Sequence, residues 1–113
     1  MAGLPHAAKA FVPDEKFALY LVPTHKVGGP KLKFLESFGF DRADREAMRT
    51  ALIAHAGAWE AAVIPTPFGV KYEVDGPLTT PSGVEPWVRT VWHIDDGAAD
   101  PRFVTLKPLT RPR

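Results

Sequence analysis

Side chains that could carry out chemistry alternate with apolar ones in the stretch from Trp87 to Pro108. Two runs rich in β-branched and aromatic residues flank the polar segment DDGAADP, which predicts a long hairpin. Successive side chains of a strand point to opposite faces, so one face is expected to carry the core residues Val88, Thr90, Trp92 and Ile94. The other face would then collect the candidate functional residues Trp87, Arg89, His93, Phe103, Thr105 and Lys107.

These residue types favour acid–base chemistry without a metal or another cofactor. The chain has no cysteine, its four histidines lack a metal-binding spacing, and neither serine lies in a nucleophile motif. Cleavage of RNA by its own 2′-hydroxyl needs a base, an acid and cations beside the phosphate, which His, Glu, Lys and Arg can supply. The predicted catalytic residues are Arg89, His25, His93, Thr105 and Lys107, and the predicted substrate-binding residues are Lys26, Lys31, Lys71, Trp87 and Phe103.

The same residues also have structural interpretations. Arg89 and Lys107 could be solvated strand residues that pair with Glu73 across the sheet. His93 could simply end a strand. His55 shares the apolar stripe of a predicted helix, so a structural role is favoured for it.

Length and composition are those of an ordinary globular domain. With 113 residues, of which 45% are hydrophobic and 24% charged, the chain is predicted to form a single domain over residues 1–113. The formal net charge of +1 does not itself indicate a nucleic-acid partner, and the absence of Asn and Gln disfavours sequence-specific reading of a duplex. The sequence has no secretory signal and no apolar run that could span a bilayer, so a cytoplasmic protein without a membrane partner is expected.

Helices are expected in the first half of the chain and strands in the second. Asp14 follows a proline and marks the start of a short amphipathic helix that Pro23 ends, and a second helix is predicted over about 30–37. Asp41 is the expected N-cap of a third and longer helix. This order predicts an α+β fold, in which N-terminal helices (about 14–56) pack on one face of a four-stranded antiparallel sheet (about 60–108).

Four blocks cover most of the chain in order: LPHAAKAFVPDEKFALYLV, THKVGGPKLKFLESFGF, TPFGVKYEVDGPLTTPSG and VRTVWHIDDGAADPRFVTLKP. In these blocks the chain resembles an uncharacterised bacterial domain family found in polymorphic-toxin C-termini and in small toxin–antitoxin operons. Its layout of helices followed by four antiparallel strands also resembles the metal-independent ribonuclease toxins that include barnase and RelE. By position, the polar sites that such toxins use are matched by His25, Lys26, Arg89 and Thr105.

The resemblance and the residue inventory together favour a metal-independent endoribonuclease toxin that cleaves RNA by 2′-hydroxyl attack. Its expected partners are RNA and a cognate antitoxin or immunity protein that covers the exposed sheet face. It would act in the cytoplasm, alone or delivered as part of a larger secreted toxin, and no oligomeric state is predicted. The alternative is a non-catalytic protein-binding module of a toxin–antitoxin or phage-defence operon. An enzyme acting on a nucleotide is a third hypothesis, which would need a closed pocket near His25.

Overall fold

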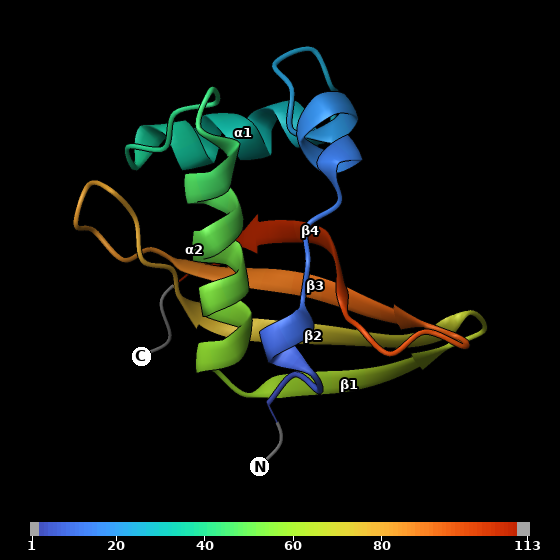
Figure 1. Ribbon diagram of the computed structural model, residues 1–113. Coiled ribbons are helices and arrows are strands. Elements are labelled where there is room, and N and C mark those ends of the chain that lie inside the picture. Colours follow the sequence, from blue (N-terminus) through green and yellow to red (C-terminus); the bar gives the residue numbers. More distant parts are fainter. Residues whose placement is uncertain (1–2, 111–113) are drawn as a thin grey trace.

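The computed structural model describes residues 3–110, in which helices precede a β-sheet (Figure 1). The elements in chain order are η1 (Ala7–Lys9), η2 (Lys16–Tyr20), α1 (Gly28–Ser37), α2 (Arg45–Ala58), β1 (Ala61–Thr66), β2 (Gly69–Pro77), β3 (Trp87–Asp95) and β4 (Arg102–Pro108). Of the two short elements, η1 is a 3₁₀ turn and η2 is a stretch of π-helix. This order confirms the predicted α+β fold class.

The strands form one antiparallel sheet in the order β1-β2-β3-β4, so each strand pairs with its neighbours in the sequence. Helix α2 crosses one face of this sheet with η1 beside it, whereas η2 and α1 lie beyond β4 (Figure 1). The buried side of α2 consists of Met48, Leu52, His55 and Ala56. Within residues 3–110, no helix crosses the opposite face of the sheet, which we call the open face.

Helix boundaries differ from the sequence-based prediction where two capping residues compete. The N-cap of α2 is Asp44, whose side chain accepts a hydrogen bond from the backbone N–H of Ala47 at 3.1 Å. Asp41, the predicted cap, instead accepts from the backbone N–H of Ala43 at 2.8 Å and closes the turn that precedes the helix. The prediction for Asp41 is therefore wrong by one turn, because an Asp stabilises a turn and a helix start by the same kind of hydrogen bond.

The segment before η2 contributes to the core. Leu4, Ala10 and Val12 are buried. Phe11 forms an isolated parallel bridge with Arg102, and its carbonyl accepts from the backbone N–H of Phe103 at 2.9 Å. The N-terminal segment therefore covers part of the outer edge of β4.

A β-bulge in the β3–β4 pair decides which residues of β4 face the core. Trp92 pairs with Phe103, whereas the preceding residue Val91 pairs with Thr105, so Val104 has no partner in β3. The extra residue shifts the alternation, and Phe103 is 0% exposed, with its ring edge-on to that of Trp92 at 5.4 Å. The prediction that Phe103 binds substrate on the open face is therefore wrong.

His55 lies in the core beneath α2, as its place in an apolar stripe predicts. Its Nε2 donates to the carbonyl of Gly76 at 3.0 Å, and its Nδ1 accepts from the hydroxyl of Thr90 at 2.8 Å. The same hydroxyl oxygen accepts from Nε1 of Trp92 at 2.9 Å. One neutral tautomer of His55 thus satisfies the whole chain of hydrogen bonds, and burial lowers the pKa of this imidazole, which favours that neutral form.

Candidate functional site

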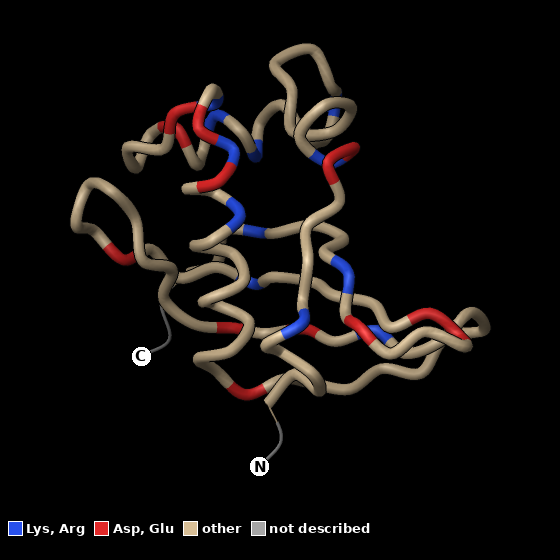
Figure 2. Tube along the Cα trace, in the orientation of Figure 1, with Lys and Arg blue, Asp and Glu red and all other residues tan. Residues whose placement is uncertain are grey.

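Basic and acidic residues both occur along β2, β3 and β4 (Figure 2), and the register of the strands places most of them on the open face. Directly opposite residues of antiparallel strands share a face, so the register defines its members. They include Lys71, Glu73 and Asp75 of β2, Trp87, Arg89, Val91, His93 and Asp95 of β3, and Arg102, Thr105 and Lys107 of β4. The four predicted catalytic residues of β3 and β4 therefore lie on one face.

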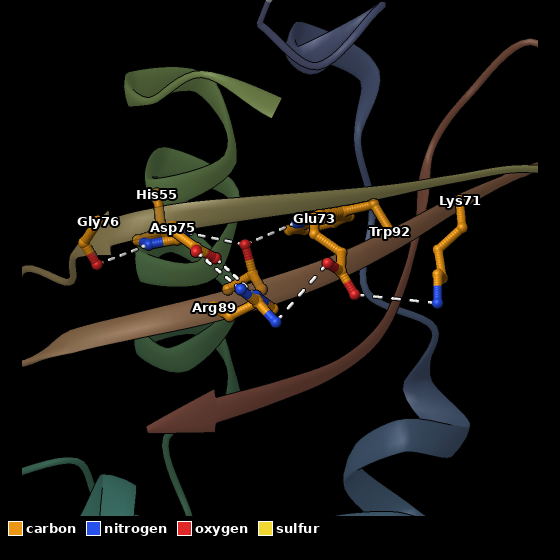
Figure 3. Close-up of polar contacts among 8 residues, drawn as sticks. His55, Lys71, Glu73, Asp75, Gly76, Arg89 and Trp92 are labelled. Carbon is orange, nitrogen blue, oxygen red and sulfur yellow. Dashed lines mark hydrogen bonds and ion pairs between the residues drawn. The ribbon is translucent and has the colours of Figure 1, made fainter. Parts of the chain in front are cut away.

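Glu73 lies on β2 between two cations (Figure 3). Its carboxylate is 3.9 Å from Nζ of Lys71 and 3.7 Å from a terminal nitrogen of Arg89. Arg89 also forms a two-pronged pair with Asp75, with nitrogen–oxygen distances of 2.8 and 3.0 Å. These hydrogen bonds raise the pKa of Arg89 above its already high ordinary value, so its charge is permanent. The alternation of Val70, Lys71, Tyr72 and Glu73 is the sequence signal that could have marked Glu73 as a candidate in its own right.

His93 is on the open face but is only 8% exposed, because both ring nitrogens are held by neighbours. Its Nδ1 lies 2.7 Å from Asp95, and its Nε2 lies 3.0 Å from the hydroxyl of Thr66. That hydroxyl donates to the carbonyl of Gly69 and accepts from the backbone N–H of Phe68. Since a carboxylate only accepts, Nδ1 of His93 is the donor in its hydrogen bond with Asp95.

Asp95 links His93 to β4. Besides His93, it binds Arg102 through two hydrogen bonds of 2.9 and 3.1 Å. The hydrogen bond from Arg102 and, to a smaller extent, the one from His93 lower the pKa of Asp95 below its ordinary value. The three side chains hold the end of β3 against the start of β4.

A second cluster joins the loop before α1 to β4. His25 Nδ1 accepts from the backbone N–H groups of Val27 and Gly28 at 3.0 and 2.9 Å, so the proton of its neutral ring is on Nε2. Its ring packs edge-on against Tyr20 at 4.9 Å, and the hydroxyl of Tyr20 lies 2.8 Å from that of Thr105. The sequence pattern suggested only a buried helical stripe for Tyr20, because Phe17, Tyr20 and Leu21 have helical spacing.

The remaining predicted binding residues are distributed around these clusters. Lys31 donates from Nζ to the carbonyl of Leu106 at 2.5 Å. Lys26 is exposed in the loop after His25, and Trp87 is half-buried at the start of β3. Of the ten predicted site residues, only Phe103 is placed in the core away from the open face.

The part of the chain that the structure describes contains no group of three or more His, Cys, Asp or Glu side chains that could hold a metal ion. A cavity of about 450 Å³ is lined by Pro23, Gly29, Pro30, Leu32, Lys33, Glu36 and Arg42, and none of these is a predicted site residue. Among the described helices, none is long and apolar enough to cross a membrane.

The fold is similar to that of a chain in the structure titled as a contact-dependent growth inhibition toxin–immunity protein complex from Klebsiella pneumoniae 342. The TM-score is 0.55 and the sequence identity 15%, over 87% of this chain and 98% of that chain. At this identity the likeness shows a shared fold. No curated protein matches the sequence.

A family model described as a domain of unknown function, DUF6883, matches residues 3–110. The match includes all helices and strands described above. The chain therefore belongs to the DUF6883 family of domains of unknown function.

Proposed function

We propose that this protein is a metal-independent endoribonuclease toxin, which cleaves RNA through attack of a 2′-hydroxyl on the neighbouring phosphorus. The observation that supports it best is Glu73, a carboxylate on an open sheet face with Lys71 at 3.9 Å and Arg89 at 3.7 Å. The reaction needs this combination, because the attacking hydroxyl must lose a proton while the phosphate gains negative charge.

Glu73 is the general base in this proposal. It accepts the proton of the 2′-hydroxyl as that oxygen bonds to phosphorus. Arg89 binds two phosphate oxygens with its planar guanidinium, and Lys71 adds a point charge. Before substrate binds, Arg89 is paired with Asp75, whose side chain is 41% exposed, so the incoming phosphate exchanges with a solvated carboxylate.

His93 is the general acid. It is a diagonal neighbour of Glu73 across the β2–β3 pair, and such neighbours are about 7–8 Å apart, which leaves room for a phosphate between base and acid. His93 protonates the departing 5′-oxygen from Nε2, the nitrogen that contacts Thr66, and Asp95 orients the ring through Nδ1. The phosphorus–O5′ bond breaks, and the products are a 2′,3′-cyclic phosphate and a 5′-hydroxyl.

His25 and Thr105 bind substrate in this scheme instead of transferring protons. Because Nδ1 of His25 accepts two backbone N–H groups, this ring cannot also carry a proton there, so it serves as a neutral donor through Nε2. Thr105 is two strands away from Glu73, about 10 Å across the sheet, and can contact the nucleotide next to the reacting phosphate.

A cognate immunity protein is the proposed partner that neutralises the toxin. The support for it is the likeness in fold to a chain from a toxin–immunity protein complex. We assign the open face as its binding surface, because a protein seated there would cover Glu73, Arg89 and Lys107 together. The proposed place of action is the cytoplasm, where RNA is available, whether the domain acts alone or is delivered as part of a larger secreted toxin.

The experiment that tests this function is incubation of the purified protein with total RNA in excess chelator. We expect fragments with cyclic-phosphate ends from the unaltered protein, and a loss of fragments for Glu73→Gln and for His93→Gln. Glu85→Gln, which changes an exposed carboxylate in the loop before β3, is the matched control and should cut normally. Intact RNA together with tight binding of an operon-encoded protein would instead support the non-catalytic binding module.

A further inference from the structure

Segments that precede α2 contact the outer side of β4 (Figure 1). Phe11 bridges to Arg102 at the start of the strand. Tyr20 reaches Thr105 in its middle, and Lys31 reaches the carbonyl of Leu106 near its end. Three separate segments of the N-terminal half therefore contact β4 one after another along its length.

Two basic side chains, Lys16 of η2 and Arg102 of β4, lie near the start of β4. The ammonium of Lys16 lies over the ring of Tyr20, 4.7 Å from its centroid. Burial and, next to it, the charge of Arg102 lower the pKa of Lys16. Within residues 3–110 no carboxylate pairs with Lys16, and Arg102 shares the single carboxylate Asp95 with His93.

Two more cations meet at the other end of the strand. Lys31 is held by its hydrogen bond to the carbonyl of Leu106, and Lys107 follows directly on β4 with an exposed side chain. Burial and the charge of Lys107 lower the pKa of Lys31. Among the described residues, neither lysine forms an ion pair.

Figure 2 shows these basic positions on β4 and on the η2 and α1 segments beside it. Bringing like charges together costs electrostatic free energy, and a bound anion removes that cost. Arg102 and Lys107 are five positions apart, which corresponds to about 15 Å along a strand. The uncharged hydroxyls of Tyr20 and Thr105 lie between the two cation pairs along β4.

We propose that β4 and the η2 and α1 residues beside it form a track for the backbone of single-stranded RNA, with one phosphate at Lys16 and Arg102 and another at Lys31 and Lys107. A single extended backbone can pass both cation pairs, because they lie in line along one strand. A duplex presents two backbones wound around each other and does not follow a straight edge of this kind. The inference rests on the proposed function and specifies its substrate as unpaired RNA.

The test is the affinity of the full chain for a short single-stranded oligonucleotide in which every 2′-oxygen is methylated, so that it cannot be cleaved. Fluorescence anisotropy between 50 and 200 mM salt gives the slope of log affinity against log salt, which reports the number of phosphates that the protein neutralises (roughly 0.7 per contact). Lys16→Ala and Lys107→Ala should each reduce this slope by about 0.7 and weaken binding on the order of tenfold at low salt. Lys9→Ala, an exposed lysine of η1, removes the same charge elsewhere and should change neither.

Slopes unchanged in both Lys16→Ala and Lys107→Ala, or a duplex of equal length bound as tightly as the single strand, would overturn the track. Lys107 is exposed, so its substitution keeps the test valid even if Lys16→Ala unfolds the protein. The outcome is separable from that of the proposed function. Salt-dependent binding through these cations without cleavage of ordinary RNA would reject the nuclease and keep the track. Cleavage of ordinary RNA, with binding unaltered in Lys16→Ala and Lys107→Ala, would keep the nuclease and reject the track.

Discussion

Two histidines on opposite faces of the same sheet are held by contrasting sets of partners. Beneath α2, His55 contacts only neutral groups, the hydroxyl of Thr90 and the carbonyl of Gly76, and its hydrogen bonds fit one uncharged tautomer. On the open face, His93 lies between the carboxylate of Asp95, to which its Nδ1 donates, and the hydroxyl of Thr66. Adjacent residues of β3 serve the two faces: Thr90 joins the buried hydrogen bonds of His55 and Trp92, and Arg89 joins the ion pairs with Glu73 and Asp75 (Figure 3).

The difference separates stability from chemistry along a single strand. Buried polar groups cost free energy when they lose a partner, so the covered face is sensitive to any change in its hydrogen bonds. The pairs on the open face are partly solvated, and exposed ion pairs contribute little to folding. Substitutions on the covered face should therefore lower the free energy of unfolding, and those on the open face should reduce activity with little change in stability.

Glu73→Gln should have the largest effect, a loss of RNA cleavage on the order of a thousandfold, or about 4 kcal/mol of transition-state stabilisation. The amide keeps the shape of the side chain but cannot accept the proton of the 2′-hydroxyl. Single-turnover cleavage measures the effect, and denaturant unfolding should show a stability within about 1 kcal/mol of the unaltered protein. Normal cleavage by Glu73→Gln would remove Glu73 from the mechanism.

Arg89→Ala should lower cleavage on the order of a hundredfold, and Arg89→Lys should restore only part of it, because charge returns without the two-pronged geometry. Arg42 offers a matched control, since it makes a similar two-pronged pair with Glu36 outside the open face. Arg42→Ala should cleave at the normal rate. If both Arg89 variants cut normally, the guanidinium serves only to pair with Asp75.

Thr90→Val should act in the opposite way on the covered face. It removes the hydroxyl that serves both His55 and Trp92, so an imidazole nitrogen and an indole N–H lose their partner. We expect a loss of about 2–3 kcal/mol in the free energy of unfolding, with cleavage per folded molecule unchanged. Thr79→Val, in the exposed loop before β3, should leave both quantities unaltered.

The buried imidazole also predicts a pH dependence of stability. The pKa of His55 is lowered in the folded state, so its contribution is complete above the unfolded value of about 6.5 and is lost as the pH falls below it. The slope contributed by this one group is at most about 1.4 kcal/mol per pH unit, which makes it the smallest effect predicted here.

Urea unfolding between pH 7.5 and 5.5 measures this slope, and His55→Gln should reduce it, because the amide has the same neutral hydrogen-bonding roles without a titration. Substitution of the exposed His6 by Ala should not change it. An unchanged slope in His55→Gln would assign the pH dependence to another group.

Sequence patterns predicted the fold and the faces of the sheet as far as the β-bulge. The alternation of apolar and polar residues assigned β2 and β3 correctly, since both strands run without interruption from Gly69 to Pro77 and from Trp87 to Asp95. In β4 the unpaired Val104 shifts the alternation, so Phe103, which was predicted to bind substrate, lies in the core. A bulge depends on hydrogen bonds with the partner strand, which a local pattern does not contain.

The partners of each candidate residue could not be predicted for a similar reason. His93 was predicted as a site residue, but its contact with Thr66 joins positions 27 apart. Tyr20 and Thr105 are separated by 85 positions, and only the folded chain brings them together. The types of the residues and their alternation along a strand thus predict which side chains face outward. Tertiary structure decides which of these side chains lie within reach of one another.

The most direct test of the central claim compares two oligonucleotides of the same sequence in excess chelator, one made entirely of RNA and one with a single 2′-deoxy residue at the cleavage position. The proposed mechanism predicts that the unaltered protein cuts the first, leaving a 2′,3′-cyclic phosphate that mass spectrometry identifies, and leaves the second intact at that position. Equal cleavage of both, or cleavage of the first only after a divalent metal is added, would contradict it.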